Sequence, residues 1–241
     1  MRVKLNQCNN ITFQMHVTFF IMLSLNEFDR GNKMIIILNG CSSAGKTSII
    51  KEMQNLYDTP LLHMGLDRFW AMVPAQYKEY GIKADEGYSF SKAYDSNHNP
   101  IIHIQGGPLV TQIDHTMPQV VHTLADCGHD VAVDEIFIND KILYNYAKAL
   151  ESHTVYFVGI LCSLEELERR EKQRGNRSLG LARGLIDLVH TSKKYYDLTI
   201  DTTNLDVATC AQKIIHFIQQ TPQPLGLKNL RKSNMGGLKI A

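Results

Sequence analysis

Short apolar runs alternate with longer stretches in which apolar positions recur at helical spacing along most of this chain. Runs of this kind that are rich in Ile and Val are typical of strands buried on both faces of a sheet. Five of them are predicted to be strands, at residues 34–39, 61–64, 131–133, 154–161 and 198–201. Helical patterns follow Asp67 and Ser163 and occupy residues 47–56, 112–127, 142–150, 179–192 and 205–219. Because parallel strands need crossover connections, the alternation predicts an α/β fold, a five-stranded parallel sheet with helices on both faces.

Three segments depart from this alternation. Residues 81–105 carry turn-forming residues between two apolar stretches and are predicted to be a hairpin insert. Residues 1–33 contain an apolar stretch too short for a membrane span and no signal-peptide cleavage site, which favours an N-terminal extension, with Met34 as an alternative start. Residues 220–241, rich in proline, glycine and basic residues, are predicted to be a loosely held tail. One domain is therefore expected at 34–219.

Composition narrows the classes of function. The chain has 241 residues, of which 44% are apolar and 20% charged, and a formal net charge of +1. This near-neutral balance argues against a basic nucleic-acid surface and a polybasic membrane anchor, so the expected partner is a small molecule. Five cysteines without a CxxC pair indicate a reduced, cytoplasmic protein, and the histidines lack the spacing of a structural metal site. Nothing in the pattern indicates an oligomeric state.

A glycine-rich motif lies between the first predicted strand and its helix. Residues 40–47 read GCSSAGKT and match the phosphate-binding pattern GxxxxGK[ST] in full. Its backbone N–H groups are expected to surround phosphates at the positive end of the helix, while Lys46 reaches the outer phosphates and Thr47 binds Mg²⁺. Cys41 is interpreted as a packed neutral thiol, with a thiol activated by the helix end as the alternative. The motif predicts a site for ATP and Mg²⁺.

Two carboxylates are expected at the edge of the sheet where this motif lies. Asp134 follows the strand at 131–133, the position from which an aspartate of P-loop proteins holds Mg²⁺ through water. Its neighbour Glu135 would orient water in an ATPase, and is otherwise a solvated or structural carboxylate. Asp67 follows the strand at 61–64, where it would suit a general base that accepts the proton of a substrate hydroxyl. The alternative role of Asp67 is to cap a helix.

Arginines cluster in the segment ELERREKQRGNR, residues 166–177. The helix that contains it begins with a capping box formed by Ser163 and Glu166. Arg174 and Arg177 fall in a predicted lid near 170–180, from which they would close over a nucleotide and stabilise the transferring phosphoryl group. Arg169 and Arg170 could act in the same way or pair with glutamates on the helix face.

Seven ordered segments resemble the chloramphenicol phosphotransferase family of P-loop kinases over about 34–219. They are IIILNGCSSAGKTS at 35–48, HMGLD at 63–67, IQGGP at 104–108, VAVDEIF at 131–137, VGILCSLEELERREKQRGNRSLGLARG at 158–184, VH at 189–190 and YYDLTIDTT at 195–203. The resemblance implies a nucleoside-monophosphate-kinase-like P-loop NTPase fold and transfer of the γ-phosphate of ATP to an alcohol. By position it implies Asp67 as the catalytic base, Arg174 and Arg177 as lid arginines, and a nucleotide loop consisting of Gly40, Cys41, Ser42, Ser43, Ala44, Gly45, Lys46, Thr47 and Ser48.

The chain departs from the family pattern at Cys41, at Asn176 where RGDR is common, at Leu185 where Gln is frequent, and in the insert at 81–105. These departures leave the kinase chemistry in place but put chloramphenicol in doubt as the acceptor, which is expected to be a hydroxylated small molecule.

Two other classes of function remain open. One is a P-loop ATPase that uses Asp134 and Glu135 for hydrolysis. The other is a nucleotide-binding module that presents the extensions 1–33 and 220–241 to a partner protein.

Overall fold

The computed structural model describes residues 33–175 and 179–235 of the chain. Arg177, Asn176 and nearly all of the N-terminal extension therefore lie outside the described residues. Among those that are described, no helix has the length and apolar character needed to cross a membrane.

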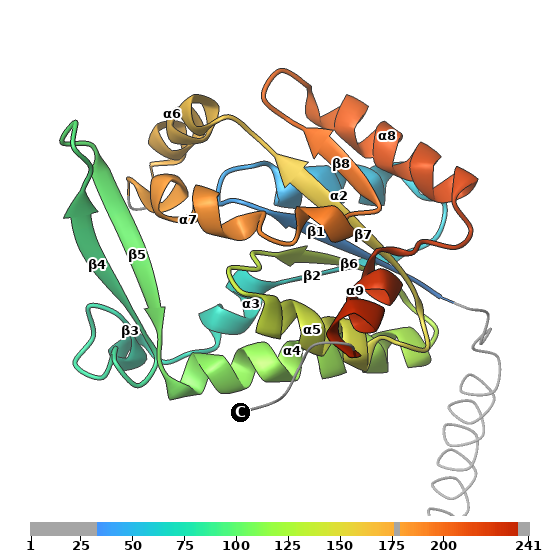
Figure 1. Ribbon diagram of the computed structural model, residues 1–241, viewed down its shortest axis with the longest axis horizontal. Helices are drawn as coiled ribbons and strands as arrows, with labels where there is room; N and C mark the ends of the chain where they lie inside the picture. The colour runs from blue at the N-terminus through green and yellow to red at the C-terminus, as the bar shows by residue number, and fades with distance from the viewer. Residues whose placement is uncertain (1–32, 176–178, 236–241) are drawn as a thin grey trace, which may run out of the picture. The chain divides into compact units, whose positions relative to one another are not determined.

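A five-stranded parallel sheet forms the centre of the domain, as the sequence predicts (Figure 1). Its strands run in the order β2-β6-β1-β7-β8. Their bounds are Leu61–Gly65 for β2, Asp130–Glu135 for β6, Met34–Gly40 for β1, Thr154–Leu161 for β7 and Leu198–Asp201 for β8. β1 thus pairs on both edges, with Leu38 beside Asp134 of β6 and Val158 of β7. This pairing brings the phosphate motif and Asp134 to one carboxyl edge of the sheet.

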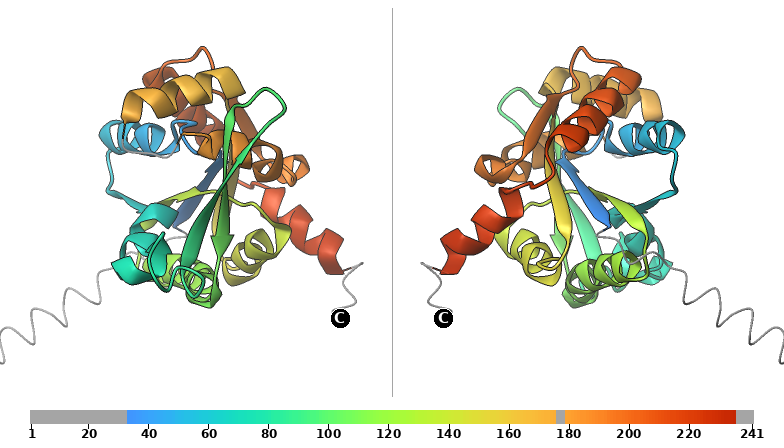
Figure 2. Two further views of the ribbon diagram at one scale, coloured as in Figure 1. Left: turned by 90° about the vertical axis from the view of Figure 1, so that its left-hand side faces the viewer. Right: turned by 90° about the vertical axis from the view of Figure 1, so that its right-hand side faces the viewer.

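Helices cover both faces of the sheet, and Figure 2 shows the two layers. Successive residues of β1 point to opposite faces, with Ile36 and Leu38 in one buried cluster and Ile35 and Ile37 in the other. The first cluster packs against α2 (Lys46–Leu56), α6 (Leu164–Arg174), α7 (Leu181–Val189) and α8 (Val207–Gln220). The second packs against α4 (Pro108–Asp126), α5 (Asp140–Ala149) and α9 (Gly226–Met235). A short helix, α3 (Leu66–Ala71), follows β2.

The segment predicted as a hairpin forms the antiparallel strands β4 (Tyr88–Tyr94) and β5 (Pro100–Gly106), with the short β3 (Lys78–Glu79) beside β4. β5 lies against α7 at two glycines. A Cβ on Gly184 would come within 2.0 Å of the Ile102 backbone oxygen, and one on Gly180 within 2.3 Å of the Pro100 oxygen. Only residues without a side chain permit this approach, which brings the hairpin next to the sheet edge that carries the motif.

The prediction of a loosely held C-terminal tail is wrong for most of its described part. Residues Gly226–Met235 form α9, and Leu227 and Leu230, each 2% exposed, belong to the core on the α4–α5 side. Asp197 fixes the start of this helix, because its Oδ1 accepts from the backbone N–H groups of Leu225 and Gly226 at 2.8 and 2.7 Å. The prolines and glycines favoured a loop, but the segment forms a short amphipathic helix that is stabilised by contacts with residues distant in the sequence.

Replacing Leu227 or Leu230 by alanine is expected to lower the free energy of unfolding by about 2–3 kcal/mol, because each change leaves a cavity in a packed core. Urea denaturation measures the effect. Leu225→Ala is the matched control, since Leu225 is 49% exposed just before the same helix. Equal stability of all three variants would mean that α9 does not pack on the core.

Candidate active site

The phosphate-binding motif forms a tight loop between β1 and α2. Gly45, the residue before α2, has a left-handed backbone with φ of 96°, and Ser43 is also left-handed with φ of 66°. A glycine offers no side chain to cap the helix, so the first N–H groups of α2 remain available to an anion. The loop therefore has the backbone form that phosphate binding requires.

Lys46 and Thr47, the first residues of α2, both contact Asp134 at the end of β6. Nζ of Lys46 lies 3.5 Å from Oδ1 of Asp134 and donates to the backbone oxygens of Gly40 and Cys41 at 2.7 and 3.1 Å. The Thr47 hydroxyl donates to Oδ2 of Asp134. Hydroxyl and carboxylate oxygens are ligands that Mg²⁺ accepts, so the two residues predicted to hold the metal lie together.

Three buried polar atoms of the described residues lack a hydrogen-bond partner: Oγ of Ser42, Oγ of Ser43 and Nε2 of His63. All three residues line one cavity of about 220 Å³, called the phosphate cavity below. Its lining also includes Lys46, Thr47, Asp134 and Arg174. Since buried polar groups are nearly always hydrogen-bonded, polar atoms left open beside a lysine are what phosphate oxygens would satisfy. The residues present thus fit a nucleotide phosphate and its Mg²⁺.

His63 is a residue of this cavity that sequence analysis missed, because the histidines were considered only for the spacing of a structural metal site. It lies on β2, two residues before the strand ends, with Nε2 4.0 Å from Oδ2 of Asp134. Burial lowers the pKa of His63, opposed by the nearby carboxylate of Asp134. Its place near the carboxyl end of a predicted strand, the edge at which ligands bind in parallel sheets, was the signal that could have identified it.

Cys41, inside the loop, is a packed thiol. Burial raises its pKa to about 12, although the ammonium of Lys46 acts in the opposite direction. The thiol donates to the backbone oxygen of Ala182 in α7 at 3.4 Å. The loop cysteine is therefore neutral and joins the motif to α7, in agreement with the packed interpretation.

Asp67 lies in the first turn of α3, directly after β2, and its side chain is exposed. The residue that caps this helix is Gly65, so the alternative role of Asp67 as an N-cap is wrong. Asp67 lines the phosphate cavity and also a second cavity of about 380 Å³, called the aromatic cavity below. Leu66 and Ile136 are the other residues shared by the two linings. The carboxylate of Asp67 thus lies at the junction between the two spaces.

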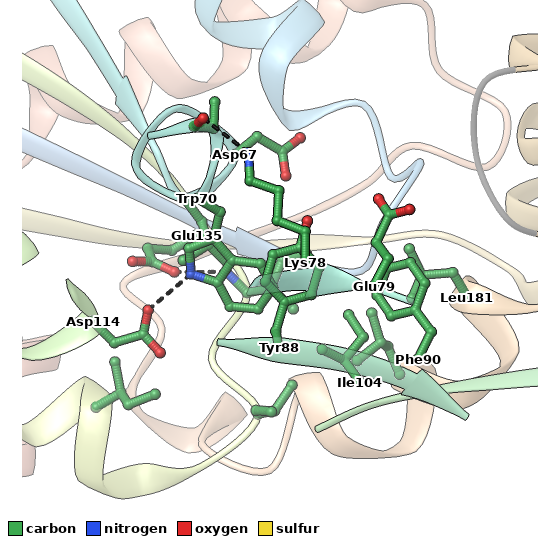
Figure 3. A pocket seen from close by; sticks show the side chains of 16 residues that line it. Asp67, Trp70, Lys78, Glu79, Tyr88, Phe90, Ile104, Asp114, Glu135 and Leu181 are labelled. Atoms are coloured by element: carbon green, nitrogen blue, oxygen red, sulfur yellow. Dashed lines mark hydrogen bonds between the residues drawn. The ribbon is translucent and has the colours of Figure 1, made fainter. Parts of the chain in front are cut away.

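Aromatic rings form one wall of the aromatic cavity (Figure 3). Trp70 stacks on Tyr88 with ring centroids 4.6 Å apart, and Tyr88 lies 5.7 Å from Phe90 of the same strand. Nε1 of Trp70 donates to Oδ1 of Asp114 at 3.1 Å, which fixes the indole between α3 and α4. The cavity combines flat apolar surface with carboxylates that accept hydrogen bonds, a combination suited to a small organic molecule.

Glu135 borders the aromatic cavity and is absent from the lining of the phosphate cavity. It is 2% exposed, and its carboxylate accepts from the Tyr146 hydroxyl at 2.8 Å and from the backbone N–H of Ile136 at 3.0 Å. Burial raises the pKa of Glu135 to about 7, and the two hydrogen bonds oppose the shift. Both oxygens are engaged away from the motif, an arrangement that does not suit a residue that orients water for hydrolysis.

Glu135→Gln is expected to flatten the pH dependence of stability. The Glu135 carboxyl binds its proton more tightly in the folded chain, so its contribution to stability is full below about pH 4.5 and decreases as pH rises to about 7. The decrease corresponds to about 2–3 kcal/mol. Urea denaturation at pH 5 and pH 8 measures it, with the exposed Glu165→Gln as control. If Glu135→Gln and wild type lose equal stability over this interval, the pKa of Glu135 is not raised.

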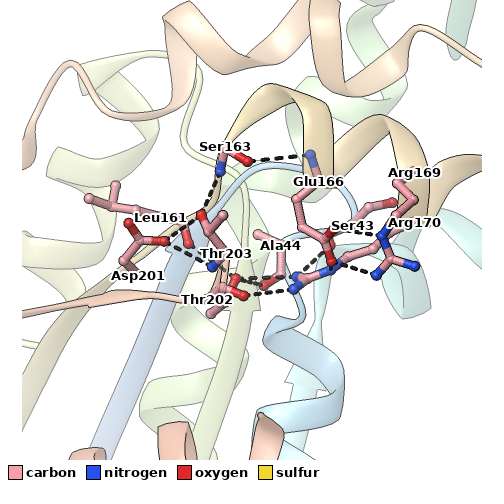
Figure 4. A network of polar contacts seen from close by, with 10 residues as sticks. All are labelled: Ser43, Ala44, Leu161, Ser163, Glu166, Arg169, Arg170, Asp201, Thr202 and Thr203. Atoms are coloured by element: carbon pink, nitrogen blue, oxygen red, sulfur yellow. Dashed lines mark hydrogen bonds and ion pairs between the residues drawn. The ribbon is translucent and has the colours of Figure 1, made fainter. Parts of the chain in front are cut away.

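Arg170 joins α6 to the phosphate loop in a polar network (Figure 4). Its guanidinium donates to the backbone oxygen of Ser43 at 3.4 Å and to that of Thr202 at 2.7 Å. Arg169 and Arg170 both donate to Glu166, which confirms the pairing on the helix face. The capping box is only half formed: the Ser163 hydroxyl accepts from the Glu166 N–H, while the carboxylate of Glu166 is turned to the arginines.

Of the two predicted lid arginines, Arg174 lines the phosphate cavity and also a larger groove beside Thr202 and Arg170. Arg177 lies outside the described residues. Glu171, 1% exposed on the same helix, accepts from the backbone N–H of Gly180 at 3.1 Å and of Ala182 at 2.6 Å. A buried carboxylate thus connects α6 with the start of α7.

The sequence profile of the "Chloramphenicol phosphotransferase-like protein" family matches residues 33–219. A protein of Mycobacterium tuberculosis named "Putative O-phosphotransferase", found in two strains, is 30% identical over 198 residues, which are 82% of this chain and 88% of that protein.

Solved structures of kinases share the fold at low sequence identity. The APS kinase of M. tuberculosis, in complex with AMPPNP and APS, has a TM-score of 0.54 at 17% identity, and the match covers 78% of this chain and 98% of that kinase. Shikimate kinase from Acinetobacter baumannii, in complex with shikimate, has a TM-score of 0.53 at 15% identity, and the match covers 79% of this chain and 95% of that kinase. The fold is therefore that of P-loop kinases.

Proposed function

This chain belongs to the chloramphenicol phosphotransferase-like family of P-loop phosphotransferases, and from that premise we propose that it transfers the γ-phosphate of ATP to the hydroxyl of a small organic alcohol. The observation that carries the proposal is the position of Asp67 at the junction of the phosphate and aromatic cavities. A group that takes a proton from an alcohol as its oxygen attacks phosphorus must reach both substrates.

Five residues that line the phosphate cavity have a part in this reaction. The N–H groups after Gly45 and the ammonium of Lys46 bind phosphate oxygens. To do so, Lys46 gives up its hydrogen bonds to the backbone oxygens of Gly40 and Cys41. Thr47 and Asp134 would hold Mg²⁺, which neutralises charge on the phosphates when it is bound. Arg174 adds positive charge beside the transferring group.

Asp67 accepts the proton of the acceptor hydroxyl. The acceptor oxygen forms a bond to the γ-phosphorus while the bond from that phosphorus to the β–γ bridging oxygen breaks, which leaves ADP. The aromatic cavity positions the hydroxyl for this attack. A molecule held against its aromatic wall would reach the phosphate cavity at Asp67, where the two cavities meet.

The walls of the aromatic cavity indicate which acceptors would fit. Trp70, Tyr88 and Phe90 offer flat surface to a ring, and Asp114 and Glu79 offer carboxylate oxygens to hydroxyl or amide N–H donors. Chloramphenicol, with an aromatic ring, an amide N–H and a primary hydroxyl, is the first acceptor to test, and antibiotic resistance follows if it is used.

The rival ATPase is less well supported. Hydrolysis would need Glu135 at the phosphate cavity, and this carboxylate is buried against Tyr146 and borders the acceptor space instead. A separate cavity of about 380 Å³ next to the phosphate site also has no use in simple hydrolysis.

Release of ADP from Mg·ATP with and without chloramphenicol, followed by mass spectrometry, tests the proposal. The expected result for a substrate is a product heavier by one phosphoryl group and ADP release that depends on the acceptor. Other ring-bearing alcohols are the next acceptors if chloramphenicol is inert. Rapid ADP release that no acceptor stimulates, and that Glu135→Gln abolishes, would instead establish the ATPase.

Binding of an acceptor is expected to change the fluorescence of Trp70, the single tryptophan of the chain. Because this indole lines the aromatic cavity, the signal reports occupancy of that cavity without turnover. A compound that is phosphorylated but leaves Trp70 fluorescence unchanged at saturation would place the acceptor elsewhere.

A further inference from the structure

Two histidines and an aspartate meet at the edge of the sheet opposite the phosphate loop. His122 and Asp126 lie one turn apart near the end of α4, and His153 directly precedes β7. One ligand atom from each of the three side chains lies within 4.8 Å of the others. None of the three lines the phosphate or the aromatic cavity, so the proposed phosphoryl transfer does not use them.

The distances between these atoms match those between ligands of one small cation. Nε2 of His153 lies 3.0 Å from Nδ1 of His122 and 3.2 Å from Oδ1 of Asp126. Ligands bound tetrahedrally to zinc at about 2.0–2.1 Å are about 3.3–3.4 Å apart. Small rotations of the side chains would open the contacts to that spacing. The end of α4 and the start of β7 bring the three ligand atoms within 4.8 Å of one another.

Burial of the three groups suits a site open on one side. His153 is almost fully buried, with 8% of its side chain exposed, whereas His122 is 33% and Asp126 57% exposed. Three protein ligands would leave a fourth position to water.

We propose that His122, Asp126 and His153 form a binding site for a divalent transition-metal ion of the zinc class. Two imidazoles and one carboxylate are a donor set that zinc, cobalt and nickel favour and that Mg²⁺ and Ca²⁺, which prefer oxygen ligands, do not. The bound ion ties the end of α4 to the connection between α5 and β7. It stabilises the amino edge of the sheet at a distance from the reacting groups.

The sequence did not reveal this site because its ligands are not contiguous. His122 and Asp126 have the i, i+4 spacing of ligands on one helix, but the third ligand comes 27 residues after Asp126 (153 − 126). Motif searches for paired histidines or cysteines do not detect such a combination.

Titration of the full-length, metal-free protein without a histidine tag tests the proposal. Co²⁺ is the spectroscopic probe, because tetrahedral Co²⁺ absorbs visible light much more strongly than octahedral aqueous Co²⁺. Zn²⁺ is the probe for calorimetry. The expected result is one ion per chain at this site, with affinity reduced at least about 100-fold in His122→Ala and in Asp126→Asn. His103→Ala, an exposed histidine on β5, is the matched control and should bind as wild type does.

Thermal unfolding provides a second readout, since an ion that binds only the folded chain raises the midpoint. Zn²⁺ should raise it for wild type and for His103→Ala and leave it unchanged for His122→Ala and Asp126→Asn. Both ligand variants alter side chains that are partly exposed, so folding is retained and can be checked by circular dichroism. Absence of a tetrahedral cobalt spectrum, or equal affinity in the ligand variants and wild type, would overturn the proposal.

Discussion

Asp67→Asn is expected to reduce acceptor-dependent phosphoryl transfer by about 10²–10⁴-fold, the range by which a positioned general base contributes to a rate. The amide keeps the size of the side chain but cannot take the proton of the acceptor hydroxyl. Asp67 is exposed and in the first turn of a short helix, so the substitution leaves the fold intact. Initial rates at saturating ATP and acceptor measure the effect on kcat.

Nucleotide affinity separates this catalytic role from a structural one. Because Asp67 borders the phosphate cavity without forming the loop, the Kd for Mg·ATP should change by no more than a few-fold in Asp67→Asn. Asp58→Asn is the matched control, an exposed aspartate before β2 that lines neither cavity, and should retain the full rate. If Asp67→Asn loses nucleotide binding as severely as turnover, Asp67 supports the loop and is not the base.

Glu171→Ala is expected to lower the free energy of unfolding by about 3–5 kcal/mol. The substitution removes the acceptor of two buried backbone N–H groups, those of Gly180 and Ala182, and leaves a cavity in the core. Guanidinium or urea denaturation measures the loss. Glu165→Ala, in the first turn of the same helix and exposed, should change stability by less than about 0.5 kcal/mol.

The same variant tests the connection between α6 and α7. Without Glu171 the start of α7 loses two hydrogen bonds to the helix that carries Arg174, while the ion pair of Arg183 with Glu168 remains. The KM for ATP should therefore rise in protein that is still folded at low temperature. Stability equal to that of Glu165→Ala would show that water satisfies the two N–H groups and that the carboxylate is dispensable.

The parallel sheet could be predicted because its evidence is local. Each strand is a short, almost continuous apolar run, and the phosphate motif lies between one such run and an amphipathic helix, so Lys46, Thr47 and Asp134 follow from topology alone. Some boundaries differ from the prediction. The helix predicted from Gln112 begins at Pro108, because proline is favoured in the first turn of a helix.

Features that depend on pairs of residues distant in sequence escaped prediction. The hydrogen bond from Trp70 to Asp114 joins residues 44 positions apart in the sequence. The hydrogen bonds of Asp197 with Leu225 and Gly226 join residues 28 and 29 positions apart. The contact of His63 with Asp134 forms only because β2 pairs with β6 in the folded sheet. A pattern along one strand or helix contains no information on which partner it will meet.

The position of β1 in the sheet has a consequence for synthesis of the protein. This strand carries the phosphate motif and is among the first parts of the domain to leave the ribosome, yet its two neighbours are β6 and β7, which ends at Leu161. At about 5–20 residues per second, the ribosome needs about 6–24 s to proceed from Gly40 to Leu161. Both edges of this apolar strand of Ile and Leu lack a partner until β6 is complete at Glu135, and the edge that β7 covers stays unpaired and exposed to other nascent chains until Leu161 is made. Yield in a cell should therefore depend on chaperones that bind the emerging chain before residue 161 is made.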